Sequence, residues 1–279
     1  MRNCNYTSYN EIVSFGTITE EKNNPAKSTL NAITGRIATS YIQYLNNFPS
    51  LEGKSKSDIL KNETSERAAL QLCYSSETKS FKFIRGKIFD IQPDELKAFC
   101  PYCLLNKPKT LDHYIGQTEF PEYSILQRNL IPCCFDCNNN KGEQWRKDKK
   151  RRFIHFYNDT FLTNRFLHGS LIYHRGEIVP RIDFCLMKPA AMSVSDFRIV
   201  KFHFKDLHLL QEYNTRANAL VSSEIAVITD SYHGGATIDQ IIASLTSRAN
   251  ALSADFGINY WSAVMYETLA NNNRLIRSL

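Results

Sequence analysis

The stretch that decides the fold is CPYCLLNKPKTLDHYIGQTEFPEYSILQRNLIPCCFDCNNNKGEQW, residues 100–145. It contains two C-x2-C pairs, Cys100 with Cys103 and Cys134 with Cys137. Four thiolates at this spacing are enough for a closed tetrahedral zinc site. Cys133 also precedes Cys137, but only Cys134 leaves a gap of two residues, so we expect Cys133 to be a packing residue. A closed site of four cysteines is structural, because no coordination position remains for a reactive water.

Other polar residues lie between and beside the two cysteine pairs. Asp112 and His113 fall in the strand-like segment TLDHYI, and Asn129 precedes the apolar LIP. Asn138 follows Cys137 directly, at the start of the helix-like FDCNNNKGEQW. Residues four apart in a helix share a face, as Cys134 and Asn138 would. A bound zinc would therefore fix the helix of Asn138 against the strand of His113.

This pattern resembles the HNH endonuclease family, whose ββα-metal core is held together by zinc. The shared features are C-x2-C, D-H, N-L-I-P, C-x2-C-N and K-G, in the order and spacing of the family, over about 45 residues. The resemblance implies that His113 is the general base and that Asn129 braces the loop and orients His113. It also implies that Asp112 and Asn138 hold a catalytic Mg²⁺ or Mn²⁺.

The chemistry of phosphodiester hydrolysis agrees with these roles. Imidazole titrates near neutral pH and suits the deprotonation of water. A divalent ion held by a carboxylate and an amide oxygen suits the neutralisation of phosphate charge. One departure from the family is Gly116, which stands where proline is common, and a glycine there would leave the loop less rigid.

The net charge of +6 is unevenly distributed. Residues 97–152 hold 11 Lys and Arg against 6 Asp and Glu, whereas the rest of the chain is nearly balanced. Six of the seven residues 146–152 are basic. At a helix end, such a run would bind backbone phosphates without reading the base sequence. The candidate DNA-binding residues are Lys141, Arg146, Lys147, Lys149, Lys150, Arg151 and Arg152.

The flanks of this segment are mixed in pattern. Apolar residues recur at helical spacing between Pro25 and Cys73 and predict two helices. The first should end at residues 46–49. The second should be capped at Ser57-Asp58 and contain Ile59 and Leu60. Residues 80–91 resemble a strand pair that turns at Arg85-Gly86, and residues 171–187 and 197–204 also resemble strands, with a turn at Arg175-Gly176. The expected helix caps near the end of the chain are Asp206, Thr237 with Gln240, and Asn259. Cys4, Cys73 and Cys185 read as buried residues. The remaining histidines, His155 and His174 among them, lack partners at ligand spacing.

These patterns predict an α+β protein. A helical region at 1–94 precedes a ββα module at 95–152, and a mixed, mainly helical region follows at 153–279. The chain is 43% hydrophobic and 22% charged, without an apolar run of the roughly 20 residues that a membrane helix needs. It also lacks the apolar stretch of a signal peptide near its start. We therefore expect a cytoplasmic protein that does not bind membranes.

The function expected from the resemblance is a metal-dependent endonuclease that hydrolyses DNA, with RNA not excluded. The alternative is a zinc-stabilised nucleic-acid- or protein-binding subunit without catalysis, which would tolerate the loss of Asp112 and His113. The layout also resembles the nuclease subunits of bacterial anti-phage systems such as Septu and certain retrons. That resemblance implies an ABC-type or related ATPase partner, while restriction and mobile-element nucleases are the competing contexts.

Overall fold

The structure, a computed structural model, describes residues 1–7, 9–54, 57, 64–173, 180–272 and 275. The protein is α+β, as the sequence predicts. Its chain divides into two compact units, of which one comprises Cys4–Asn158 and the other comprises Met1–Asn3 with Asp159–Leu279. The Cys4–Asn158 unit therefore contains the module expected at 95–152 and all but the first three residues of the region expected at 1–94.

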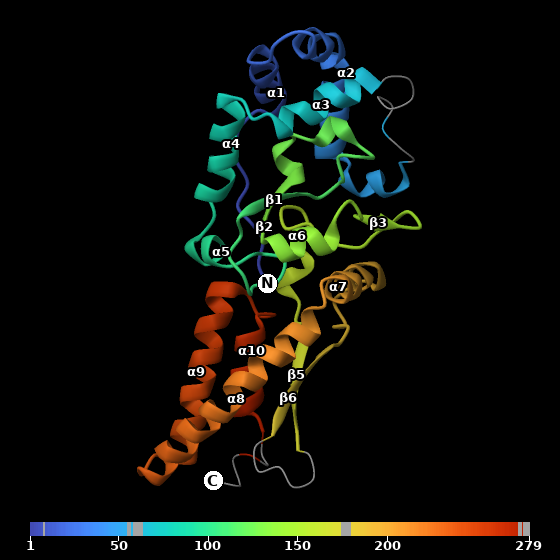
Figure 1. Ribbon diagram of the computed structural model, residues 1–279. Coiled ribbons are helices and arrows are strands. Elements are labelled where there is room, and N and C mark those ends of the chain that lie inside the picture. Colours follow the sequence, from blue (N-terminus) through green and yellow to red (C-terminus); the bar gives the residue numbers. More distant parts are fainter. Residues whose placement is uncertain (8, 55–56, 58–63, 174–179, 273–274, 276–279) are drawn as a thin grey trace. The chain divides into compact units, whose positions relative to one another are not determined.

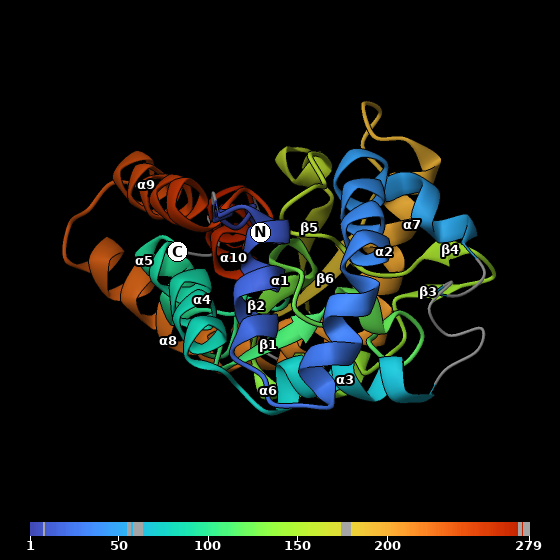
Figure 2. The same ribbon diagram turned by 90° about the horizontal axis from the view of Figure 1, so that it is seen from above.

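Helices form most of the first half of the Cys4–Asn158 unit. These elements are α1 (Glu11–Glu20), α2 (Ala26–Asn46), the 3-10 helix η1 (Phe48–Gly53), α3 (Thr64–Ser75), α4 (Lys79–Asp90) and α5 (Asp94–Ala98). In α2 the buried residues recur every three or four positions, from Leu30 to Tyr44, so one face of the helix packs inward. Helices α1 and α2 lie side by side (Figure 2).

The strand pair expected at residues 80–91 is wrong, because this segment is helix α4. The Thr78 hydroxyl caps the helix by accepting a hydrogen bond from the Phe81 backbone amide. Phe81, Ile84 and Ile88 are buried along one face. Gly86 lies inside the helix and makes no turn. The helical spacing of these apolar residues decides the conformation, although a short apolar segment can also suit a strand.

The second half of this unit contains short strands around a short helix (Figure 1). Strand β1 (Thr110–His113) pairs antiparallel with β2 (Leu130–Cys133), with His113 opposite Leu130 and Asp112 opposite Ile131. Helix α6 (Phe135–Lys141) follows β2 directly and packs against β1. In the chain, the segment between β1 and β2 contains two short 3-10 helices, η3 (Pro121–Tyr123) and η4 (Gln127–Asn129). The hairpin β3 (Arg146–Lys147) and β4 (Lys150–Arg151) comes next.

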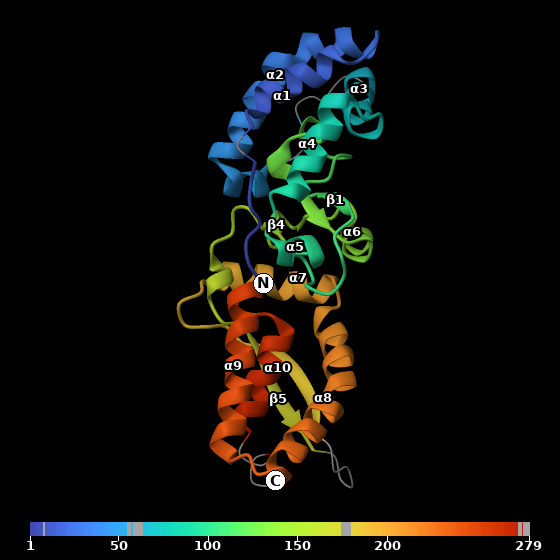
Figure 3. The same cartoon turned by 90° about the vertical axis from the view of Figure 1, so that its left-hand side faces the viewer.

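The other unit packs helices on a two-stranded ribbon. Strand β5 (Leu167–Ile172) pairs antiparallel with β6 (Arg181–Leu186). The strand-like segment expected at 171–187 covers β6 but only the last two residues of β5. The helices are α7 (Val194–Asp206), α8 (Leu209–His233), α9 (Ile238–Phe256) and α10 (Trp261–Ala270), and the 3-10 helix η5 (Phe161–Thr163) precedes β5. Helix α10 packs on β5 and on α9, whereas α8 packs on β6 (Figure 3). Side chains of α8 bind the backbone amides at the free edge of β6. The side-chain carbonyl of Asn218 accepts a hydrogen bond from the Ile182 amide, and that of Asn214 accepts one from the Phe184 amide.

The first three residues of the chain belong to this second unit. Arg2 donates a hydrogen bond to the Asp255 carbonyl at 2.7 Å. Met1 is buried against Gly257, where an added Cβ would lie 2.2 Å from the Met1 carbonyl oxygen. Gly257 also has φ +86°, a conformation that favours glycine. Met1 and Arg2 thus pack against the C-terminal end of α9.

Several sequence-based expectations for this unit need correction. Residues 197–204 form part of helix α7 instead of a strand, because the Ser193 hydroxyl caps the helix and Val200 and Phe204 are buried four residues apart. Asp206 ends α7 and caps nothing, since α8 begins after His208. Asn259 does not cap α10; its amide binds the backbone of residues 162–167 instead.

Other expectations fare better or fall outside the described residues. The capping box of Thr237 and Gln240 is confirmed. Cys4 and Cys73 are buried as expected, but Cys185 is exposed. Asp58, Ile59, Leu60, His174 and the turn at Arg175-Gly176 lie outside the described residues. Among the described helices, none is both long and apolar enough to cross a membrane.

Candidate active site and metal centre

The two cysteine pairs come together as the sequence predicts. Cys100, Cys103, Cys134 and Cys137 are all buried, and their four sulfur atoms lie within 4.8 Å of one another. The first pair occupies a tight turn in which the Leu104 amide donates to the Cys100 carbonyl at 2.7 Å. The second pair lies at the start of α6, with Cys134 at the N-cap position.

This cluster fits a tetrahedral metal such as zinc. The Cys103 and Cys134 sulfurs are 3.9 Å apart. A zinc ion with Zn–S bonds of about 2.3 Å places its sulfur ligands about 3.8 Å apart, so the observed spacing matches. Cys133 is also buried, but it is not among the four clustered sulfurs. The four sulfurs that could hold a metal thus include that of Cys134, the residue that the sequence favours, and not that of Cys133.

His113 is the last residue of strand β1, whose first residue, Thr110, pairs with Cys133, and it is partly exposed. Its Nε2 lies 2.9 Å from the Ser124 carbonyl oxygen. A carbonyl only accepts hydrogen bonds, so Nε2 carries the proton and Nδ1 keeps a lone pair. The Tyr74 ring packs against the imidazole edge-on, with ring centres 4.3 Å apart. Burial lowers the pKa of His113 below its usual 6.5, so the ring is neutral at pH 7.

Asn129 is fully buried and binds both ends of the loop that follows His113. Its side-chain carbonyl accepts a hydrogen bond from the Ile115 amide at 2.8 Å. Its side-chain amide donates to the Ile115 carbonyl at 3.0 Å and to the Tyr123 carbonyl at 3.1 Å. Tyr123 is next to Ser124, the acceptor of the His113 hydrogen bond. Asn129 therefore occupies the place that a loop brace needs.

Two residues that the sequence did not single out support Asn129. His155 is fully buried, and its Nδ1 accepts from the Tyr157 amide at 3.3 Å, so its Nε2 donates to the Tyr44 hydroxyl at 3.0 Å. The Tyr44 hydroxyl in turn lies 3.2 Å from the Asn129 carbonyl oxygen and donates to it. Tyr44 and His155 are far from Asn129 in the chain, so no local pattern could have indicated this network.

Asp112 is held in a buried ion pair. Its Oδ1 accepts a hydrogen bond from the Lys141 ammonium at 2.9 Å, and its Oδ2 accepts one from the Tyr102 hydroxyl at 2.6 Å. The two charged side chains are 2% exposed or less. Lys141 also donates to the His113 carbonyl at 2.7 Å. The expectation that Lys141 binds DNA phosphates does not match this burial.

In this arrangement the residues do not fit a divalent cation. The Lys141 ammonium already neutralises the carboxylate of Asp112, and Tyr102 covers its other oxygen. The Asn138 side-chain amide donates to the Thr110 hydroxyl at 3.1 Å, on the same face of α6 as Lys141. Asp112 and Asn138 lie on facing elements, as expected, but they form no open pair of oxygen ligands. An ion at Asp112 would have to replace Lys141.

The basic run 146–152 forms a hairpin, not a helix end. Asp148 and Lys149 have φ +50° and +56°, as the two central residues of a type I′ turn require. Lys147, Lys149 and Lys150 are exposed, and Arg152 is partly exposed. The other two arginines bind the chain itself. Arg146 donates to the Glu52 carbonyl and the Glu119 carboxylate, and Arg151 pairs with the Glu52 carboxylate.

Comparison with known proteins gives a single partial match to report. The chain is 27% identical to protein ea31 of Escherichia phage lambda over 192 residues, which cover 64% of each chain. The chain thus spans less than two thirds of the length of this relative. No family model matches the chain. No solved structure matches it either.

Proposed function

We propose that the Cys4–Asn158 unit is an endonuclease that hydrolyses DNA phosphodiester bonds, with His113 as its general base. The observation that carries the proposal is the hydrogen bond from His113 Nε2 to the Ser124 carbonyl. It leaves the Nδ1 lone pair of a neutral, partly exposed imidazole available for the proton of a water. That water attacks the phosphorus atom, and the bond from phosphorus to the leaving oxygen breaks.

The surroundings of His113 support this role. Strands β1 and β2 and helix α6 follow one another in the order of the ββα core that the resemblance implies. The cysteine cluster links the turn before β1 to the start of α6. Asn129 fixes the loop that supplies the Ser124 carbonyl. The β3–β4 hairpin offers exposed cations for the phosphates of the DNA backbone, namely Lys147, Lys149 and Lys150. The divalent ion that the resemblance implies is tested in the assay, and no step is assigned to it.

The test is plasmid cleavage by the wild type and by His113→Ala, in Mg²⁺, in Mn²⁺ and in a chelator that spares tightly bound zinc. We expect nicked or linear DNA with the wild type, and a rate about 10²- to 10⁴-fold lower with the variant. Both proteins should retain equal zinc, which separates a lost base from a lost fold. If wild type and variant cleave equally, His113 is not the base. If neither cleaves but both bind DNA, the non-catalytic binding subunit is the better description.

The biological setting stays a prediction. We propose, from the resemblance to anti-phage nuclease subunits, that an ABC-type or related ATPase is the partner of this chain. Purification from the native operon should then recover such an ATPase in a fixed ratio to the chain. Recovery of the chain alone, with the neighbouring gene products present in the cell, would contradict it.

A further inference from the structure

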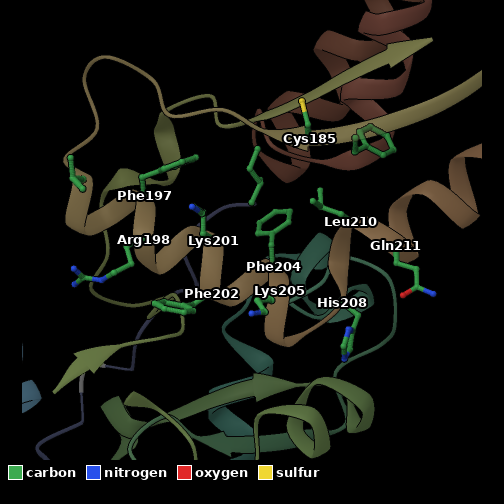
Figure 4. Close-up of a pocket in the computed structure, with 13 residues that line it drawn as sticks. Cys185, Phe197, Arg198, Lys201, Phe202, Phe204, Lys205, His208, Leu210 and Gln211 are labelled. Carbon is green, nitrogen blue, oxygen red and sulfur yellow. The ribbon is translucent and has the colours of Figure 1, made fainter. Parts of the chain in front are cut away.

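Helix α7 presents two neighbouring stripes in which aromatic and basic side chains alternate. Phe197, Lys201 and Phe204 form one stripe at positions i, i+4 and i+7, and Arg198, Phe202 and Lys205 form the other at the same spacing. Figure 4 shows the first three projecting toward Cys185 and Leu210, and the other three from the adjacent side of the helix. The core of the unit uses a different set of α7 residues, among which only Phe204 is shared.

These two stripes line a cavity of about 940 Å³ between β6, α7 and the start of α8. Phe204 is 2% exposed and forms its floor, whereas Phe197 and Phe202 are partly exposed. Lys201 and Lys205 are exposed at its edge. A cavity of this size, with apolar walls and a few polar groups, is typical of a ligand site.

The charge of the cavity has one sign. Arg198, Lys201 and Lys205 line it, and none of its described lining residues is acidic. Along the helix axis these cations are separated by three and four residues, or about 4.5 and 6 Å. The cavity therefore favours a ligand that carries several anionic groups at short, regular spacing and also has flat apolar parts.

Single-stranded nucleic acid has both properties. Its phosphates repeat along the backbone, and its unstacked bases pack on exposed aromatic rings, as in proteins that bind single strands without sequence preference. A duplex offers the same phosphates, but its bases are stacked inside and cannot reach a concave surface. An acidic peptide would satisfy the cations, but nothing in it requires aromatic rings in place of aliphatic side chains.

We propose that this cavity binds single-stranded nucleic acid, with a base on Phe197 and phosphates on Arg198, Lys201 and Lys205. The site lies wholly within the unit of Asp159–Leu279. It goes beyond the proposed cleavage at His113, because binding here needs no reaction. Cleavage and binding are therefore measured separately, and either can fail without the other.

The experiment measures fluorescence anisotropy of a labelled thymidine oligomer of about 15 nucleotides. The full-length His113→Ala chain is used, so that the oligomer is not consumed. We expect Phe197→Leu to weaken binding about tenfold and Phe197→Trp to restore it, since leucine keeps the apolar bulk but removes the stacking face. Lys201→Gln should lower the salt slope, log Kd against log salt concentration, by about 0.7 for one lost phosphate contact.

Matched controls decide the outcome. Arg216→Gln removes an exposed cation of α8 outside the cavity and should leave both affinity and salt slope unchanged. An abasic oligomer of equal length should bind about tenfold more weakly than the thymidine oligomer. The proposal is overturned if the abasic oligomer or a duplex binds equally well, or if polyglutamate competes as strongly at equal charge. It is also overturned if Phe197→Leu binds as the parent does.

Discussion

At the scale of single residues, the pair Asp112 and Lys141 is the most informative departure from the sequence-based expectation. The sequence identified both side chains, one as a metal ligand and the other as a phosphate contact. In the structure they neutralise each other in the core. Because Lys141 follows Asn138 by three positions, the two share a helix face, and this spacing was the available signal that Lys141 points toward β1.

Breaking this pair should destabilise the protein strongly. Asp112→Asn leaves the Lys141 ammonium buried without a counter-charge, which costs about 3–5 kcal/mol in the free energy of unfolding. Lys141→Met should have a similar cost, since it leaves the carboxylate unpaired. The double variant should recover most of the loss, because no buried charge remains. Urea unfolding of all four proteins gives the coupling, and additive losses would mean that the pair is not buried in solution.

The buried His155 makes a prediction about pH. Burial, with Arg151 and Arg128 nearby, lowers its pKa well below the usual 6.5 in the folded protein. Below pH 6.5 the imidazole of His155 therefore binds a proton in the unfolded chain but not in the folded protein. The free energy of unfolding should fall as the pH drops below 6.5. His155→Asn should reduce this slope in denaturant titrations across that range; an unchanged slope would show that His155 does not titrate on unfolding.

At the scale of elements, the ends of the cysteine segment were the most predictable part of the fold. The strand-like TLDHYI placed Asp112-His113 at the end of a strand, and the helix-like FDCNNNKGEQW placed Asn138 in a helix; both features are present. Helices α4 and α7 were mistaken for strands because their apolar residues also alternate, and Gly86 looked like a turn. Their caps, Thr78 and Ser193, were the overlooked local signals.

The loop after His113 corrects another expectation at this scale. A Cβ at Gly116 would lie 2.2 Å from the Glu143 carboxylate and 2.9 Å from the Glu143 carbonyl oxygen. Position 116 thus requires glycine, because Glu143, which follows α6, leaves no room for a side chain there. Asn129 adds two hydrogen bonds to the Ile115 backbone in the same loop.

Metal removal should act through these same elements. Cys103→Ser takes one sulfur from the cluster, so we expect loss of bound zinc and a lower melting temperature, because metal binding and folding are coupled. Cys133→Ala is the matched control, since Cys133 is equally buried but lies outside the cluster. Zinc content and melting temperature of both variants check the prediction. Zinc loss in Cys133→Ala alone would reverse the assignment.

At the scale of the whole molecule, the hydrogen bonds and ion pairs described for the proposed active site lie in one unit. The partners described for His113, Asn129, Asp112 and the cysteines all lie within Cys4–Asn158. A chain that stops after Asn158 should therefore bind zinc and cleave plasmid DNA at a rate within a few-fold of the full chain. Cleavage and zinc assays of the truncated chain test this; zinc binding without cleavage would place an essential group in the other unit.

The position of Met1–Asn3 has a consequence for synthesis on the ribosome. These residues are synthesised before the Cys4–Asn158 unit, yet they pack beside Gly257, which is added after the whole of that unit. At ordinary elongation rates, translation from Asn158 to Gly257 takes roughly 5–20 s. During that interval the cysteine cluster and His113 can be complete while the chain's first residues still lack their binding place. A ribosome that stalls in this window would hold a nascent chain in which the Cys4–Asn158 unit is already assembled and Met1–Asn3 are still unpacked.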